Sequence, residues 1–426
     1  MTTYLLERAY VGGAVESDVL VEVEDGRFTS VTIGGSGAER LPGLTIPGLA
    51  NAHSHAFHRA LRGRTQRERG TFWTWRSQMY AAAQRLDPDS YFALARAVYR
   101  EMVAAGITTV GEFHYVHHRP GGAPYENSNA MGDALVAAAS EAGLRICLLD
   151  TVYLSSGFGE PVTEEQARYS DRSIDGWVER VSDLKDSGHA RIGAAIHSVR
   201  AVPAQVMPTI AEWAKGRPLH VHVSEQVAEN EACVAAYART PVELLADHDV
   251  LGPGTTAVHA THLDEDDLRL LNESGTTACF TPTTERDLGD GVGPGTKLAS
   301  LSLGSDSHAV IDLFEEMRAL ELDERLVSQE RGHWTAEQLL AAGTRHDTLG
   351  FADAGSIEVG ARADLVTLDT TSPRTAGTGA DEHTAAFAAT SADVVQVVAD
   401  GRVVYTKDDD EEIGRDLDEA IGALWE

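Results

Sequence analysis

Strand-like apolar runs alternate with helix-patterned segments through most of this chain, and this alternation restricts the fold more than any other feature. Segments with helical spacing, such as residues 90–105, 130–142 and 229–238, separate several of the runs. The apolar runs lie at residues 44–50, 108–113, 145–152, 192–196, 219–223, 256–259, 277–280 and 301–304. Eight strands in this pattern predict a parallel (β/α)8 barrel.

Both ends of the chain carry a different pattern, that of short antiparallel strands. Near the start, apolar alternation leads into the turn Asp25-Gly26, and near the end a similar stretch contains Asp400-Gly401. Such dipeptides are typical of tight hairpins. We therefore expect a distorted (β/α)8 barrel at residues 47–355 with a small β-sandwich domain built from both chain ends. Residues 1–46 and 356–426 would form this domain, and the second segment would add a closing helix.

Charge and composition exclude several classes of function. The 426 residues include 66 acidic and 35 basic ones, which gives a net charge of −31. This balance argues against a nucleic-acid surface and against adhesion to anionic lipid. We find no apolar run of ~18 residues and no secretory signal. The three cysteines form no C-x-x-C pair. We expect a soluble, cytoplasmic protein that acts on a small molecule, without a nucleic-acid or membrane partner.

Four groups of metal-binding residue types stand at the ends of predicted barrel strands, where barrel enzymes carry their active sites. Each group alone has a structural interpretation, because histidine and aspartate at strand ends often only bind loops. Together they form a mixed nitrogen and oxygen set that suits Zn²⁺. The groups are Asn51-Ala-His53-Ser-His55, Leu219-His220-Val-His222-Val-Ser-Glu225, Val258-His259-Ala-Thr-His262 and Gly304-Ser-Asp306-Ser-His308.

Strand geometry assigns expected roles within these groups. His53 and His55 are two residues apart, so on a strand they point to one face and can bind one metal ion. His222 lies nearer the end of its strand than His220 and is the better ligand. Glu225 stands just beyond it, where a carboxylate can move protons without being a ligand.

The order of these motifs, with a β domain built from both chain ends, resembles the amidohydrolase superfamily. The late segment Gly355-Ser-Ile-Glu-Val-Gly-Ala-Arg-Ala-Asp-Leu-Val resembles it too. The resemblance implies that His53, His55, His222 and Asp306 are metal ligands and that Glu225 and His259 are the catalytic pair. Members with two metal ions typically carry a carboxylated lysine on the fourth strand. That strand has no lysine here, so we expect one Zn²⁺ per chain.

A narrower resemblance, to the formimidoylglutamate deiminase family of histidine degradation, rests on five longer motifs. It implies hydrolysis of N-formimidoyl-L-glutamate to N-formyl-L-glutamate and ammonia, and a homodimer. One position departs from that family, because His58 stands where glutamine is expected. The motifs are His53-Ser-His-Ala-Phe-His58-Arg, Phe72-Trp-Thr-Trp-Arg76, Glu112-Phe-His-Tyr115-Val-His-His118, His197-Ser-Val-Arg200-Ala-Val and Thr283-Thr-Glu-Arg-Asp-Leu-Gly-Asp-Gly291.

A dicarboxylate substrate needs local positive charge in so acidic a protein. Arg200, after the fourth strand, is the first candidate, because its guanidinium can pair with a carboxylate through two hydrogen bonds. Arg76, in the aromatic loop after the first strand, is the second. Tyr115 offers a hydroxyl donor. His58 and His197 complete the set of expected substrate contacts.

The expected mechanism is a hydrolysis in which Asp306 accepts a proton from the attacking water. Glu225 protonates the imine nitrogen, and His259 orients the attacking oxygen. Three alternatives remain open at this point: a deaminase of a purine-type ring such as guanine, a ring-opening amidohydrolase acting on an imidazolone, and a non-catalytic metal-binding scaffold. Glu225 and His259 argue against the scaffold, since a structural zinc site needs neither.

Overall fold

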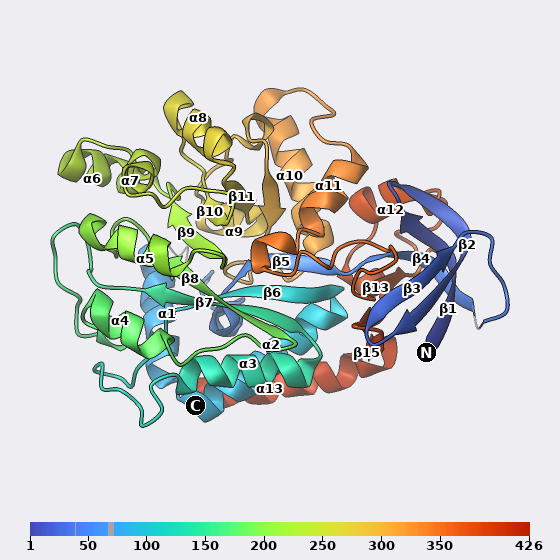
Figure 1. The fold of residues 1–426 in the computed structure, drawn as a ribbon, viewed down its shortest axis with the longest axis horizontal. Coiled ribbons are helices and arrows are strands. Elements are labelled where there is room, and N and C mark those ends of the chain that lie inside the picture. Colours follow the sequence, from blue (N-terminus) through green and yellow to red (C-terminus); the bar gives the residue numbers. More distant parts are fainter. Residues whose placement is uncertain (39, 67–71) are drawn as a thin grey trace.

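The computed structural model describes residues 1–38, 40–66 and 72–426, and its central feature is a sheet of eight parallel strands (Figure 1). An isolated parallel bridge between Ser54 and Asp306 brings the first strand beside the segment after the last one, which nearly closes a barrel. The predicted barrel is therefore confirmed. Its strands, neighbours in chain order, are β5 (Leu49–Ser54), β6 (Ile107–His114), β7 (Arg145–Val152), β8 (Ala190–Ile196), β9 (Leu219–Val223), β10 (Thr255–His259), β11 (Thr277–Phe280) and β12 (Leu301–Leu303).

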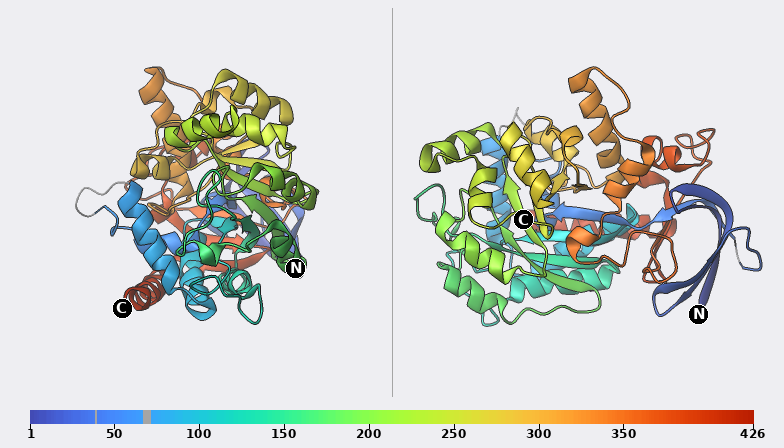
Figure 2. Two further views of the ribbon diagram at one scale, coloured as in Figure 1. Left: turned by 90° about the vertical axis from the view of Figure 1, so that its left-hand side faces the viewer. Right: turned by 45° about the horizontal axis from the view of Figure 1, so that its top comes forward.

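Helices surround the barrel strands (Figure 2). Their apolar residues join those of the strands in one large buried core. No helix in the described ranges is long and apolar enough to cross a membrane. The helices are α1 (Phe72–Arg85), α2 (Pro88–Ala104), α3 (Ala130–Ala142), α4 (Ile174–Val181), α5 (Met207–Trp213), α6 (Val227–Tyr237), α7 (Pro241–Asp247), α8 (Glu265–Ser274), α9 (Pro282–Leu288), α10 (Leu313–Ser328), α11 (Ala336–Gly343), α12 (Glu382–Phe387) and α13 (Asp410–Trp425).

The first barrel strand lies later in the chain than predicted. The run at 44–50 is not one strand, because its first half belongs to β4 (Arg40–Pro47), which pairs with β13 (Leu365–Leu368) in the other sheet. Gly48 then passes close to the side chains of Thr108 and Asp364, where a side chain of its own would collide. The barrel strand starts at Leu49 and extends to Ser54, so that it contains His53.

The two chain ends form one small β domain beside the barrel, as predicted (Figure 1). Asp25 and Asp400 both adopt positive φ, 50° and 46°, and a glycine follows each, as a tight hairpin requires. The two turns lie against each other, with the backbone of Ala363 hydrogen-bonded to Gly26 and Gly401. The sheet order is β15 (Arg402–Thr406), β14 (Val394–Ala399), β13 (Leu365–Leu368), β4, β1 (Thr2–Val11), β2 (Ala14–Glu24) and β3 (Arg27–Thr32).

Charged side chains tie the chain ends to the barrel. Arg145 of β7 is buried and forms ion pairs with Asp364 and, at 3.1 Å, with Asp400 of the small domain. The closing helix α13 packs against α2, where Arg96 and Arg100 both bind Asp416, at 3.0 and 2.7 Å. The C-terminal helix therefore covers the outside of the barrel rather than the small sheet.

Candidate active site

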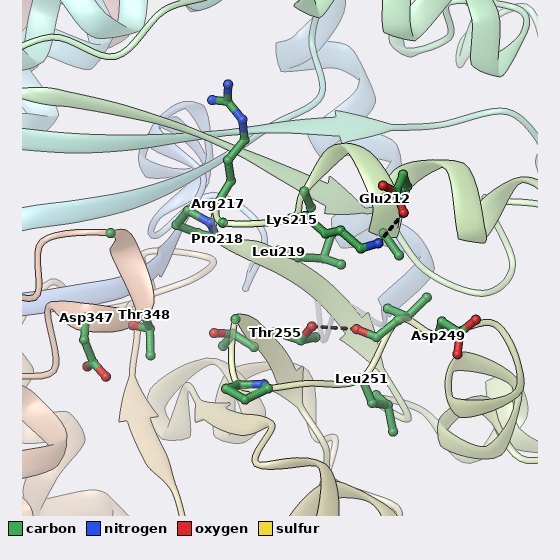
Figure 3. Close-up of a pocket in the computed structure, with 18 of the residues that line it drawn as sticks. Glu212, Lys215, Arg217, Pro218, Leu219, Asp249, Leu251, Thr255, Asp347 and Thr348 are labelled. Carbon is green, nitrogen blue, oxygen red and sulfur yellow. Dashed lines mark hydrogen bonds and ion pairs between the residues drawn. The ribbon is translucent and has the colours of Figure 1, made fainter.

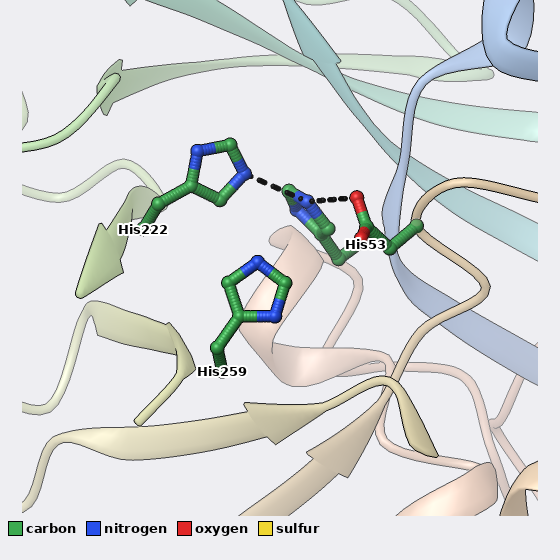
Figure 4. A group of neighbouring side chains, drawn as sticks. His53, His222 and His259 are labelled. Carbon is green, nitrogen blue, oxygen red and sulfur yellow. Dashed lines mark hydrogen bonds and ion pairs between the residues drawn. The ribbon is translucent and has the colours of Figure 1, made fainter. Parts of the chain in front are cut away.

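The carboxyl ends of the barrel strands bring together side chains from four strands. His53 lies in β5 and His55 just after it, His222 lies in β9, His259 ends β10, and Asp306 follows β12. Figure 4 shows the rings of His53, His222 and His259 converging from separate strands. This is the end of a barrel at which active sites are built.

The distances within this group are short. Nε2 of His53 and Nε2 of His55 lie 3.2 and 3.3 Å from the same oxygen, Oδ1 of Asp306. Nε2 of His222 lies 3.0 Å from Nε2 of His53. A nitrogen from each of His53, His222 and His259 and an oxygen of Asp306 all lie within 4.8 Å of one another. All five side chains are buried.

Burial and hydrogen bonding set the charges of this group. Burial lowers the pKa of His53 to about 3 and that of His222 well below its ordinary value. Burial opposes the charge of Asp306, but hydrogen bonds with His53 and His55 outweigh it and lower the pKa of the carboxyl. The site thus offers neutral imidazoles and a carboxylate, the donors that zinc prefers.

The contacts of His53 fit a cation better than hydrogen bonds alone. Its Nε2 faces both Nε2 of His222 and Oδ1 of Asp306. A single hydrogen on that nitrogen cannot be donated to both neighbours, so one lone pair stays without a partner. A cation between the three atoms satisfies all of them.

His55 is held in the tautomer that a metal ligand needs. Its Nδ1 lies 3.0 Å from the carbonyl oxygen of Phe113. Because a carbonyl only accepts, Nδ1 carries a hydrogen, and Nε2 is the nitrogen that can bind a metal ion.

His259 differs from the other histidines in its acidic neighbours. Its Nδ1 lies 3.2 Å from Oε1 of Glu285, and its Nε2 lies 3.9 Å from Oε1 of Glu225. Burial opposes its charge, but the field of Glu225 and the hydrogen bond with Glu285 raise the pKa of His259 to about 10. Carboxylates on two sides of the ring favour an imidazole that donates hydrogen bonds, which separates His259 from His53 and His222.

The backbone is strained where two of these side chains emerge. His259 has φ 69° and Ala260 φ 47°, while Asp306 has φ 37°. Residues other than glycine occupy this left-handed region at a cost of order 1–3 kcal/mol each. The chain therefore turns sharply at the ends of two barrel strands, and each turn begins at a residue of the site.

A pocket lies over this group and collects the predicted site residues. Every predicted catalytic and substrate residue lines it, and among the predicted ligands only His53 lies behind its wall. The lining residues are His55, His58, Trp75, Arg76, Met79, Tyr80, Tyr115, Tyr153, Tyr169, His197, Arg200, His222, Glu225, His259, Leu288 and Asp306.

Two arginines give this pocket positive charge. Arg200 has a side chain that is 32% exposed, and its Nε lies 3.6 Å from Oε1 of the buried Glu229. Arg76 donates from Nε to the hydroxyl of Tyr80 at 2.9 Å. The expectation that Arg76 lies in a loop is wrong, because it stands in the first turns of α1. Burial raises the pKa of the Tyr153 hydroxyl, and the positive charges of Arg200 and Arg76 counteract part of this rise.

The remaining predicted substrate residues form a polar and aromatic wall. Nε2 of His58 lies 3.1 Å from the hydroxyl of Tyr115. The ring of His197 packs edge-on against Tyr115 and His222, with both pairs of ring centroids 5.3 Å apart. The ring of His58 lies 4.5 Å from that of His55. His58 is therefore next to a predicted metal ligand as well as to the pocket.

Sequence reasoning missed part of this wall. Tyr80 follows Arg76 by four residues on α1, and helical spacing puts both on one face, so this pair was open to prediction. Tyr153 stands just after β7, and Gln166 binds both tyrosine hydroxyls, at 3.1 Å to Tyr80 and 2.9 Å to Tyr153. The contact between Gln166 and these hydroxyls joins distant segments, and no local signal marks it.

Among the histidines of the strand-end groups, His220 and His308 do not line the pocket. Nε2 of His220 lies 3.2 Å from the carbonyl oxygen of Thr348. Nε2 of His308 lies 3.0 Å from the hydroxyl of Ser54. His220 thus contacts the backbone, whereas His222 lies in the histidine and aspartate group.

Other clusters and pockets of the described chain do not match this chemistry. His114 and His117 approach Asp150, but both oxygens of Asp150 accept from Arg180, whose positive charge disfavours a metal ion there. Figure 3 shows a pocket at the amino ends of β9 and β10, the end opposite to the strand termini that carry the histidines. The labelled Lys215 is paired there with Glu212, at 2.5 Å.

Comparison with known proteins agrees with this geometry. A model of the amidohydrolase family matches residues 44–404. Formimidoylglutamate deiminase of Pseudomonas aeruginosa is 35% identical over 405 residues, 89% of each chain. The crystal structure of an amidohydrolase from Brucella melitensis aligns with a TM-score of 0.89 and 30% identity over 100% of both chains. The crystal structure of an adenosine deaminase from Xanthomonas campestris with bound zinc aligns with a TM-score of 0.84 and 21% identity. This alignment covers 99% of this chain and 98% of that chain, and it shows a similar fold.

Proposed function

Because the chain belongs to the amidohydrolase family and is a hydrolytic deaminase of that superfamily, we propose that it hydrolyses N-formimidoyl-L-glutamate. The products are N-formyl-L-glutamate and ammonia. The observation that carries this choice is the presence of two guanidinium groups, Arg200 and Arg76, in the same pocket as the histidine and aspartate group. In a protein of net charge −31, this local positive charge fits a substrate with two carboxylates.

The residues that would hold a single zinc ion are His53, His55, His222 and Asp306. When bound, the ion supplies Lewis acidity that lowers the pKa of a coordinated water. One ion is proposed rather than two because no lysine lies on β8, and each of the four lysines of the chain lies outside the barrel strands.

The side chains around that position suit the proton transfers of hydrolysis. The oxygen of water bonds to the formimidoyl carbon while Asp306 accepts a proton. Glu225, which lines the pocket with a partly exposed carboxyl, delivers a proton to the imine nitrogen. His259 donates a hydrogen bond to the attacking oxygen. The hydroxyl of the resulting tetrahedral carbon then returns a proton to Glu225, and the proton held by Asp306 passes to the departing nitrogen. The carbon–nitrogen bond breaks, ammonia leaves, and the former water oxygen becomes the formyl oxygen.

The pocket wall provides for the rest of the substrate. Arg200 and Arg76 pair with the carboxylates through charge-assisted hydrogen bonds. Tyr115 adds a hydroxyl, which His58 holds at 3.1 Å. His197 packs between the aromatic wall and His222, and limits where the amidine can lie.

A purine-type deaminase is the second candidate, and the aromatic lining favours it. Trp75, Tyr80 and Tyr153 line the pocket and offer faces on which a base could stack. The two arginines argue against this candidate, because a neutral base carries no carboxylate for a guanidinium group to bind.

A substrate panel tests the proposal. Ammonia release is measured with formimidoylglutamate, formimidoylaspartate, an uncharged formamidine, guanine, adenosine and cytosine, together with zinc content of the same sample. We expect formimidoylglutamate to be the best substrate by kcat/KM, with about one zinc per chain. Preference for guanine or adenosine would refute the substrate, and two zinc ions per active chain would refute the single-ion site.

A further inference from the structure

The motif at residues 283–291 takes no part in the mechanism above, yet it places a buried glutamate behind the site. Glu285 lies in α9, and its Oε1 is 3.2 Å from Nδ1 of His259. We propose that Glu285 is a positioning residue, which keeps the hydrogen on Nδ1 of His259 and holds Nε2 toward the reacting atoms. The proposal rests on the hydrolytic role of His259 and is independent of which amidine is the substrate.

The carboxylate of Glu285 is itself held firmly. Its two oxygens accept from the backbone nitrogen of Thr281, at 3.0 and 3.1 Å, and Oε1 accepts from the Thr281 hydroxyl at 2.9 Å. The side chain is 5% exposed. With these contacts fixed at the start of α9, Oε1 presents a stationary acceptor to the imidazole.

His259 needs such a support. Its backbone is strained, with φ 69°, and its ring stacks on that of His222 with centroids 5.3 Å apart. Because a carboxylate only accepts, Glu285 requires a hydrogen on Nδ1 of His259, and Nε2 is left as the nitrogen that can donate toward the reacting atoms. Nε2 then faces Glu225 at 3.9 Å. Without Glu285, Nδ1 keeps only the Thr281 hydroxyl, 3.4 Å away, and the ring loses its charged support on that side.

A purely structural role does not explain the charge of Glu285. Among the described residues, its one ion pair is with His259. A neutral glutamine would still accept from Thr281 through its one oxygen, and a buried carboxylate costs free energy unless a cation or several donors compensate it. The ion pair with His259 therefore explains why a charged residue stands at this position.

Glu316 of α10 supplies a matched control. It is also buried, and it binds the same helix start, with Oε2 accepting from the backbone nitrogen of Thr283 at 2.9 Å and Oε1 from its hydroxyl at 2.5 Å. Within the described chain, it forms no ion pair with a site residue. Loss of either carboxylate therefore perturbs α9, but only loss of Glu285 removes the partner of His259.

The first test compares Glu285→Gln with Glu316→Gln in the zinc-loaded full chain, on whichever panel substrate releases ammonia. We expect kcat to fall about 10- to 100-fold in Glu285→Gln, the range found for partners of site residues, with KM within about twofold and zinc content unchanged. Glu316→Gln keeps the kcat of the wild type. An equal kcat in both variants would overturn the proposal.

The second test reads the hydrogen bond at Nδ1 of His259 without any substrate, so it stands even if the substrate assignment fails. Nitrogen NMR of ¹⁵N-histidine-labelled, zinc-loaded protein identifies the His259 signal by its loss in His259→Gln. We expect the wild type to show the Nδ1 hydrogen of His259 as a hydrogen-bonded signal, and Glu285→Met, which removes this carboxylate acceptor, to lose that signal. An unchanged His259 spectrum in Glu285→Met would contradict the positioning role.

Discussion

Replacing Arg200 by methionine removes the guanidinium proposed to bind a substrate carboxylate and keeps most of the apolar stem. Hydrogen bonds to charged groups contribute ~1.5–3 kcal/mol each. The Arg200 side chain is 32% exposed, so solvent screening favours the lower end of that range. One or two such bonds at about 1.5 kcal/mol each give a total of about 1.5–3 kcal/mol. This total corresponds to a loss of about 10- to 150-fold in kcat/KM.

The ion pair with Glu229 adds a second effect that can be separated. Glu229 is 3% exposed, and in the wild type the field of Arg200 counteracts the rise that burial causes in its pKa. In Arg200→Met this carboxyl either stays charged and repels the substrate or takes up a proton. The double variant Arg200→Met/Glu229→Gln removes the repulsion, so recovery of kcat/KM in it measures that part of the loss.

The assay compares formimidoylglutamate with an uncharged formamidine in wild type and in Arg200→Met. We expect the wild type to prefer the dicarboxylate strongly and the variant to lose most of that preference at unchanged zinc content. Arg200→Lys should recover little, because a point charge cannot reproduce a two-bond contact. Arg269→Met serves as control, since this exposed arginine pairs with Asp266 and Glu273 on α8. Equal preference in wild type and Arg200→Met would refute the assignment and point to Arg76.

Three further predictions concern the metal, the proton transfer and pH. His222→Ala should lose both zinc and turnover, whereas His220→Ala should keep zinc; a zinc assay showing the reverse would refute the ligand assignment on β9. Glu225→Gln should lower kcat by at least ~10²-fold with zinc retained, and near-normal turnover would refute the proton transfer. Burial raises the pKa of Glu112 to about 7, above its unfolded value, so its contribution to stability is present at pH 4 and is lost as pH rises toward 7. Urea unfolding of metal-free protein should show Glu112→Gln gaining stability relative to wild type, by up to about 3 kcal/mol, between pH 5 and pH 8; an unchanged difference would contradict the raised pKa.

The barrel was open to prediction because its signals are local. Apolar runs of four to eight residues and the helical spacing between them follow from short-range periodicity. The residues His53, His222, His259 and Asp306 could be grouped because parallel strands place their carboxyl ends at one edge. The boundary at Gly48 could not be placed, since apolar residues continue across it and only the pairing partners, β13 or β6, divide the run.

The missed residues depend on contacts between segments far apart in sequence. Glu285 was visible as part of a motif, but its contact with His259 arises only when α9 folds against the end of β10. Gln166 joins Tyr80 and Tyr153 in the same way. The pairing of Glu229 with Arg200 likewise connects α6 with the loop after β8. Spacing along the sequence predicts which residues stand at strand ends, but it does not predict which residues from distant segments will contact them.

The most direct test of the central claim is to identify the product from formimidoylglutamate labelled with ¹³C at the formimidoyl carbon. We predict that carbon NMR shows the label appearing as the formyl carbon of N-formyl-L-glutamate, with one ammonia released per turnover. Labelled formamide with free glutamate would mean that the other carbon–nitrogen bond breaks. No turnover of this substrate by a zinc-loaded protein that deaminates adenosine or guanine would contradict the proposed function itself.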